Sequence, residues 1–142
     1  MAVSPRKGRI LAFQALYSWE VNEVSADKAL DLSWLESNKQ DIFEQGTADF
    51  SRLLVTGTIE NITAVDAMIR SHLRNWDFSR INRVDLAILR MSVYTLMYQT
   101  NISPAIVIQE AIGICKEFGT DESHRFVNGV LDGIRKTVQG TT

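Results

Sequence analysis

Apolar residues recur every three to four positions along almost the whole chain, and nowhere do apolar and polar residues alternate for long enough to form a strand. This spacing matches the turn of an α-helix, so the sequence predicts an all-α fold. The longest regular pattern extends over residues 47–73. The expected helices cover residues 5–20, 25–35, 47–73, 83–99, 104–118 and 121–138.

Residues that favour helix starts and ends divide these segments. Ser103 and Pro104 fit the N-cap and first position of a helix, because proline lacks only an N–H that would have no partner there. Gly119 is expected to end that helix in a left-handed conformation. Residues 36–40 are polar and predict a loop, and residues 75–82 predict a hinge between two halves.

Glycines inside the predicted helices need a reason, since each costs on the order of 1 kcal/mol relative to alanine. Gly57 lies in the middle of the 47–73 pattern, and Gly129 and Gly133 lie four residues apart in the last helix. We interpret all three as points where another helix approaches closely.

Bulk composition limits the class of protein. The chain has 142 residues, of which 45% are hydrophobic and 23% charged, enough for one compact domain or two small halves that share an interface. Cys115 is the only cysteine, which excludes a disulfide framework and suits a reducing compartment. No stretch approaches the roughly 18 to 20 apolar residues that span a bilayer, and no secretory signal is evident. We expect a soluble, cytoplasmic protein without a membrane partner.

The net charge of −2 hides an uneven distribution. Residues 1–19 contain Arg6, Lys7 and Arg9 without an acid, whereas residues 20–49 contain eight acids and two lysines. The basic N-terminus is therefore a local feature on an acidic background, which is compatible with nucleic-acid binding.

The chemistry of an enzyme is not evident. The two histidines, His72 and His124, have no glutamate three residues ahead, and the chain has no phosphate-binding glycine loop, HExxH motif or nucleophile elbow. Cys115 lies between Ile114 and Lys116 in a helix and is interpreted as a buried structural thiol. The sequence therefore predicts a protein that is not an enzyme.

The first helix favours a binding function. Arg6, Phe13 and Tyr17 fall on one face at i, i+7 and i+11. Cations beside aromatic rings suit single-stranded RNA, because guanidinium groups bind phosphates and bases stack on rings. The alternative is that the aromatic residues belong to the core and the basic residues form a solvated end.

Four blocks of the sequence resemble the NusB family, in order and with similar spacing, from about Arg6 to Ile134. They are RKGRILAFQALY at residues 6–17 with Trp19, RVDLAILR at 83–90 with Tyr94, AIVIQEA at 105–111, and FGTDESHRFVNGVLD at 118–132. Four blocks in register are much more specific than any one of them.

The resemblance implies two perpendicular three-helix bundles, about seven helices in all, within a single domain over residues 1–142. The halves would cover about residues 5–75 and 82–138. NusB-like proteins bind boxA-type RNA of ribosomal leaders together with NusE, a small-subunit ribosomal protein, and join an RNA polymerase antitermination complex. No cofactor or metal is implied.

The resemblance also implies functional positions. The partner-binding positions for NusE are Asp85, Phe118 and Glu122. The RNA-facing positions are Arg6, Lys7, Arg9, Gln14, Tyr17, Arg125 and Phe126. Four of these positions have a structural alternative. Asp85 and Glu122 could instead complement a helix N-terminus, and Phe118 and Phe126 could instead belong to the core.

Some questions stay open at this point. Pro5 and Gly8 stand where relatives often have Arg or Ala, and Gly8 predicts a first turn that orders only on RNA. Two other functions remain, a helical adaptor that binds only proteins and the NusB-like domain of a ribosomal RNA cytosine methyltransferase. The sequence leaves open whether the protein is a monomer or a homodimer.

Overall fold

The computed structural model describes residues 4–30, 45–74 and 77–139. Within them lie seven α-helices, one short 3-10 helix and no strand, which confirms the predicted all-α class. The elements are α1 (Pro5–Val21), α2 (Ala26–Leu30), α4 (Gln45–Glu60), α5 (Ile62–Arg70), η1 (Phe78–Arg80), α6 (Arg83–Tyr98), α7 (Pro104–Phe118) and α8 (Ser123–Gln139).

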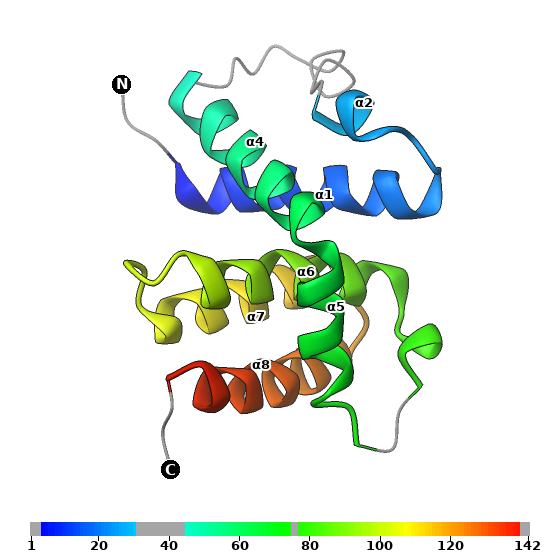
Figure 1. The fold of residues 1–142 in the computed structure, drawn as a ribbon, viewed down its shortest axis with the longest axis vertical. Coiled ribbons are helices and arrows are strands. Elements are labelled where there is room, and N and C mark those ends of the chain that lie inside the picture. The colour runs from blue at the N-terminus through cyan, green and yellow to red at the C-terminus, as the bar shows by residue number, and fades with distance from the viewer. Residues whose placement is uncertain (1–3, 31–44, 75–76, 140–142) are drawn as a thin grey trace.

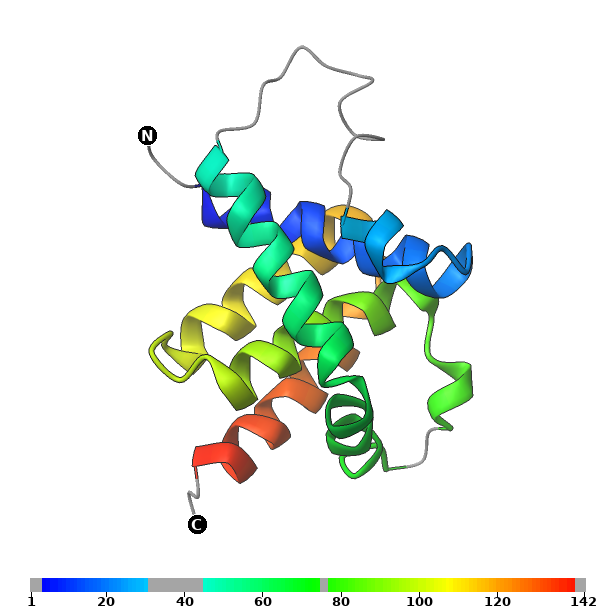
Figure 2. The ribbon, with the colours of Figure 1, turned by 45° about the horizontal axis from the view of Figure 1, so that its top comes forward.

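The helices form two bundles that pack together, as predicted. In the first bundle α1, α2 and α4 contact one another, and in the second α6, α7 and α8 do. Figure 1 shows α1 and α4 above the second bundle, with α5 descending along its side. Figure 2 shows α4 crossing α1. Helix α6 joins the two bundles, because it contacts α1, α4 and α5 as well as α7 and α8.

The position of α6 follows from its composition. Residues 85–96 are all buried, so this helix has no solvent-facing stripe. Leu86, Ile88 and Leu89 are each at most 1% exposed. Asn82 begins the helix, since its side-chain oxygen accepts hydrogen bonds from the backbone N–H groups of Val84 and Asp85.

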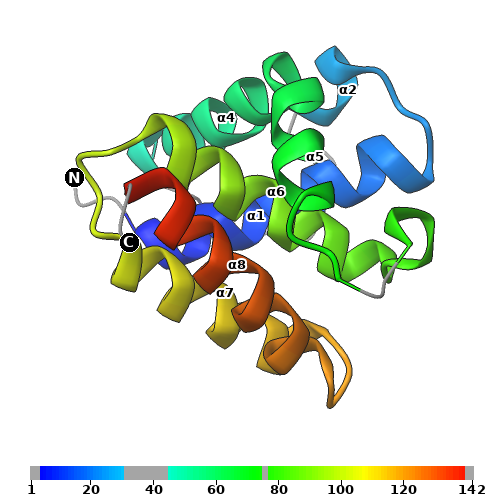
Figure 3. The ribbon, with the colours of Figure 1, turned by 60° about the horizontal axis from the view of Figure 1, so that its bottom comes forward.

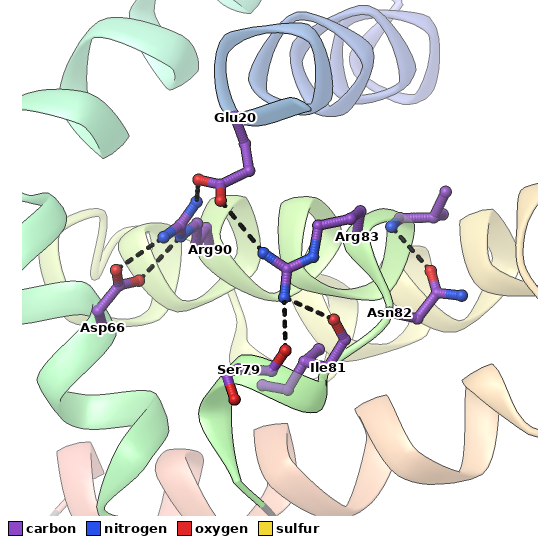
Figure 4. A network of polar contacts seen from close by, with 8 residues as sticks. Glu20, Asp66, Ser79, Ile81, Asn82, Arg83 and Arg90 are labelled. Carbon is purple, nitrogen blue, oxygen red and sulfur yellow. Dashed lines mark hydrogen bonds and ion pairs between the residues drawn. The ribbon is translucent and has the colours of Figure 1, made fainter. Parts of the chain in front are cut away.

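One charged side chain of α6 lies inside the interface between the bundles (Figure 4). The Arg90 guanidinium donates to both carboxylate oxygens of Asp66 in α5, at 2.9 and 2.8 Å, and to Glu20 of α1 at 2.8 Å. Glu20 also pairs with Arg83, which donates to the carbonyl of Ile81. This network therefore connects α1, α5, α6 and the segment that precedes α6.

The prediction of one helix over residues 47–73 is wrong, because the structure has two. Asn61 interrupts the chain between α4 and α5, with φ −114° and ψ 22°. Its side-chain amide donates to the carbonyl of Gly57 at 2.8 Å. An asparagine side chain competes with the helical backbone for hydrogen bonds in this way, and the apolar spacing alone did not reveal it. The predicted helix at 25–35 is seen as α2, and its residues 31–35 and the loop at 36–40 lie outside the described residues.

The three glycines inside helices differ in what surrounds them. A Cβ on Gly57 would overlap the ring of Tyr94, and one on Gly133 would lie 3.1 Å from the His72 ring, so close packing is confirmed at both. Close packing is wrong for Gly129, where an added Cβ meets nothing within 4 Å.

Gly119 does not adopt the predicted left-handed conformation. Its φ is −98° and its ψ is −167°, an extended conformation open to any residue. A Cβ there would lie 2.6 Å from the Ser123 hydroxyl oxygen, so glycine is required because a larger side chain would collide with Ser123.

The hinge predicted at residues 75–82 coincides with the break between α5 and α6, where η1 lies. Whether residues 5–75 and 82–138 act as two halves of one domain stays a prediction. No helix in the described part of the chain is both long and apolar enough to cross a membrane.

Candidate nucleic-acid interface

The first turn of α1 is held in place by α4. The Ser4 side chain caps the helix by accepting from the backbone N–H of Lys7, and the Ser4 N–H donates to the Thr47 hydroxyl at 3.0 Å. A Cβ on Gly8 would lie 2.6 Å from the Phe50 ring. Gly8 thus allows α4 to pack against α1, and the expectation that this turn orders only on RNA is wrong.

Arg6 extends from this turn over the surface of α7. Its guanidinium lies 3.5 Å from Glu110 and 3.9 Å from Glu117, and a Cβ on Gly113 would lie 3.1 Å from its terminal nitrogens. Glu110, Gly113 and Glu117 therefore form a cradle along one face of α7. The Arg6 side chain remains 50% exposed, so a ligand has access to it.

Arg9 is in a different environment. The residue is only 8% exposed, its guanidinium lies 3.9 Å from Glu110, and it sits 5.7 Å from the centre of the Phe50 ring. Burial lowers the pKa of Arg9, and the nearby Glu110 charge opposes that shift. Arg9 therefore joins α1 to α4 and α7, and it offers little surface to a ligand.

The other predicted binding residues of α1 also differ in their exposure to solvent. Phe13 is 3% exposed and packs against the Phe118 ring with centroids 5.2 Å apart, so the core alternative holds for Phe13. Gln14 and Tyr17 are partly exposed, so both remain accessible to a ligand.

At the start of α8, Arg125 is 77% exposed and lies 3.8 Å from Glu122, which is 80% exposed. Such exposed pairs contribute little, with a typical value of about 0–1 kcal/mol. Phe126 is partly buried against the core and lines a hollow beside α5. These two residues are on α8, and the other predicted RNA residues are on α1.

The predicted partner-binding residues gather around the turn between α7 and α8. Asp85 lies beneath it and bonds the Ser123 hydroxyl, whose oxygen accepts from the Thr120 N–H at 2.9 Å. Phe118 precedes the turn and is 37% exposed, and Glu122 lies within it.

Asp85 is 6% exposed, and its Oδ1 has no hydrogen-bond partner among the described residues. Burial raises the pKa of Asp85, and the bond from Ser123 only partly offsets this. Burial and the nearby Asp85 charge raise the pKa of the Cys115 thiol to about 12. Cys115 is fully buried, as predicted for a structural thiol. Asp85 is not the exposed N-terminal acid that the sequence alternative described.

We expect Asp85→Asn to stabilise the fold at pH 7, on the order of 1 kcal/mol. The folded pKa of this acid is raised, so the charged form costs stability at neutral pH. That cost disappears as the pH falls through the folded pKa toward about 3.9, the usual value for aspartate. Thermal unfolding between pH 3.5 and 7.5 measures the difference. Asp121→Asn removes the same charge from an exposed residue of the same turn and should show no comparable gain. A variant less stable than wild type at pH 7 would contradict this prediction.

The structure thus brings Asp85, Phe118 and Glu122 to one turn, and Arg6 and Arg9 to one side of α7. The predicted RNA residues lie on two helices, five of them on α1 and two, Arg125 and Phe126, on α8. Sequence reasoning missed the acids of α7. The spacing of Glu110, Gly113 and Glu117 was a usable signal, because residues three, four and seven apart share a helix face.

Comparison with known proteins identifies the family of this chain. The profile of the NusB family matches residues 6–136. The chain is 50% identical to the transcription antitermination protein NusB of Treponema denticola over 135 residues, which cover 95% of this chain and 98% of the relative. It is 39% identical to that of Borreliella burgdorferi, with 92% of this chain and 93% of the relative covered.

Solved structures show the same fold. The structure of T. maritima NusB has a TM-score of 0.81 and 31% identity, and the match covers 96% of this chain and 93% of that one. A structure of the antitermination factors NusB and NusE in complex with double-stranded RNA has a TM-score of 0.82 and 23% identity, covering 93% of this chain and 96% of that one.

Proposed function

The chain belongs to the NusB family, and from that membership we propose that it is a transcription antitermination factor that binds boxA-type RNA together with NusE. Relatives that match over nearly their whole length carry the name transcription antitermination protein, which is the function of a binding protein and not of an enzyme. The protein would act in the cytoplasm as part of an RNA polymerase complex.

The observation that carries RNA binding is the exposed basic start of α1. Arg6 and Lys7 are exposed on a turn that is already helical and packed against α4. Tyr17 and Gln14 are accessible farther along the same helix. Cations followed by an accessible ring and an amide suit phosphate, base stacking and base-edge contacts with a single strand. Arg125 and Phe126 add a further cation and a further ring on α8.

The NusE surface that we propose centres on the turn between α7 and α8. Phe118 and Glu122 are exposed there and are available for direct contact. Asp85 offers no exposed carboxylate for direct contact with NusE, because it is 6% exposed and hydrogen-bonded to Ser123. It positions the turn, so Asp85→Ala is expected to weaken NusE binding through the turn's geometry.

Transcription in vitro tests this function. A template with a boxA element ahead of a terminator is transcribed by RNA polymerase with NusE, with and without the chain. We expect more transcripts to read through the terminator when the chain is present, and no increase on a template that lacks boxA. An equal increase on both templates would favour the protein-only adaptor, and no increase on either would contradict the proposal.

The α7 cradle is expected to compete with RNA for Arg6. Glu117→Gln removes one of its two acids without changing its size, and both side chains of the Arg6–Glu117 pair are about half exposed. Because exposed pairs are weak, we expect RNA affinity to rise by at most about fivefold. Filter binding with boxA-type RNA measures this. Glu60→Gln, an exposed acid at the end of α4, is the control for net charge. Equal gains in both variants would show that only net charge matters.

A further inference from the structure

The α7 cradle of Glu110, Gly113 and Glu117 holds Arg6 in the free protein. The two acids lie seven positions apart and therefore share one face of the helix. The Arg6 guanidinium lies 3.5 Å from Glu110 and 3.9 Å from Glu117. Arg6 thus has anionic partners on α7 before any RNA is bound.

Gly113 provides the space for this contact. Glycine is less favourable than alanine in the interior of a helix, so its presence in α7 needs a reason. The three atoms nearest to a Cβ added at Gly113 all belong to the Arg6 guanidinium, two of them at 3.1 Å and one at 3.5 Å. A large side chain at this position would therefore displace the guanidinium from α7.

Glu117 also lies at the edge of the proposed NusE surface. It directly precedes Phe118, the last residue of α7, and the turn to α8 follows, at the lower right of Figure 3. Phe118 packs against Phe13 of α1 but remains partly exposed. A partner that covers the exposed part of Phe118 would therefore lie next to Glu117.

The two acids of the cradle differ in how easily they can change partner. Glu110 also pairs with Arg9 at 3.9 Å, and its side chain is 26% exposed. The Glu117 side chain is 54% exposed, and its pair with Arg6 is long and weak. A ribosomal protein such as NusE binds RNA, and RNA-binding proteins carry lysine and arginine side chains that neutralise phosphates. A basic group of this partner can therefore replace Arg6 at Glu117.

We propose that Glu117 is a partner-binding residue that Arg6 masks in the free protein. When NusE covers Phe118, one of its basic side chains pairs with Glu117, and Arg6 leaves the α7 cradle and contacts an RNA phosphate. Arg6 and NusE thus compete for one carboxylate, so the binding of RNA and the binding of NusE favour each other. The inference rests on the proposed function and adds Glu117 to the residues that carry NusE binding.

The first test removes the mask in the absence of RNA. The affinity of the full chain for NusE is measured by isothermal titration calorimetry. Arg6→Ala leaves Glu117 without a competing cation, so we expect NusE to bind about two- to fivefold more tightly, the range that an exposed ion pair allows. Lys28→Ala in α2 is the control for net charge, because α2 packs on α1 and α4. It should bind NusE as tightly as wild type.

The gain should depend on Glu117. Glu117→Gln alone should bind NusE no more tightly than wild type. Adding Arg6→Ala to Glu117→Gln should leave the affinity for NusE unchanged, because that variant has no carboxylate at position 117 to unmask. A gain of the same size in the double variant would show that Arg6 acts only through its charge, which would overturn the inference.

A second test displaces Arg6 without changing any charge. Gly113→Leu places a side chain where the guanidinium lies, and leucine favours a helix over glycine, so the variant should fold, as a melting curve checks. We expect the same gain in NusE affinity as for Arg6→Ala, and no further gain when the two substitutions are combined. Gly113→Ala should give a smaller gain, because the flexible arginine can avoid one methyl group by a small shift.

The outcomes separate this inference from the proposed function. If NusE binds wild type, Arg6→Ala and Gly113→Leu equally tightly, Arg6 does not mask Glu117, and the inference is wrong while the function stands. If Arg6→Ala and Gly113→Leu both bind NusE more weakly than wild type, the docked Arg6 supports the partner surface, which also overturns the inference. If wild type binds neither NusE nor boxA-type RNA, the proposed function is wrong, and the inference fails with it.

Discussion

Arg90→Ala is expected to lower the free energy of unfolding by about 3–5 kcal/mol, because it leaves the buried Asp66 carboxylate without its cation. The Arg90 side chain is 8% exposed, and that of Asp66 is 12% exposed. Burial lowers the pKa of Arg90, but the bonds to Asp66 and Glu20 outweigh this and raise it. A loss of this size is a large share of the 5–15 kcal/mol typical of a folded domain.

Urea denaturation followed by circular dichroism measures the effect. Arg135→Ala is the matched control, because Arg135 makes an equally short contact of 2.8 Å with Asp132, but on the surface. It should cost about 1 kcal/mol or less. The double variant Asp66→Ala/Arg90→Ala should lose less than the sum of the two single variants, since neither charge is then left alone. Equal losses for Arg90→Ala and Arg135→Ala would contradict the structural role of the network.

The network also predicts a dependence on pH. The bond from Arg90 lowers the pKa of Glu20, with further contributions from the charges of Arg90 and Arg83. The pKa is lower in the fold than in the unfolded chain, so Glu20 stabilises the fold above about pH 4.3, the usual glutamate value. That contribution is lost as the pH falls through the lowered pKa.

Replacing both Arg6 and Lys7 by alanine is expected to weaken RNA binding by roughly tenfold and to lower its salt slope by about 1.4, which corresponds to two phosphate contacts with a single strand. Both residues are exposed at the start of α1. From the sequence alone, Arg9 would count as a third contact and raise the change in slope to about 2. Because Arg9 is buried between Glu110 and Phe50, we do not count it as a phosphate contact.

Arg9→Ala separates the two roles of the basic cluster. We expect Arg9→Ala to lower the melting temperature and to leave the salt slope of RNA binding unchanged. The Arg6/Lys7 double variant should instead lower the salt slope and leave the melting temperature unchanged. Salt-dependent titrations and thermal melts of the same samples provide both readings. A slope change for Arg9→Ala equal to that for Arg6→Ala would show that Arg9 reaches phosphate.

The helical class and most helix boundaries follow from local signals in the sequence. Apolar spacing and Pro5 placed α1 correctly, and Ser103 with Pro104 placed the start of α7. The break at Asn61 was missed, because it depends on a side-chain bond to Gly57 and does not disturb the apolar spacing.

The candidate site was only partly predictable, because a helical wheel shows which residues share a face and not what covers that face. Phe13 and Arg9 lie near Arg6 on the wheel, yet α4 and α7 cover both. The resemblance gave Asp85, Phe118 and Glu122 as partner-binding residues. It did not show that Asp85 is buried beside Ser123, which lies thirty-eight positions later in the chain. Contacts between distant segments decided each of these cases.

The most direct test of the central claim is a titration of fluorescein-labelled boxA-type RNA with the full chain, with and without NusE, at 0.1 M salt. We predict that the chain alone binds the RNA, that NusE tightens this binding, and that a scrambled RNA of equal length binds more weakly in both cases. Absence of RNA binding under both conditions, or equal affinity for boxA-type and scrambled RNA in the presence of NusE, would contradict the account.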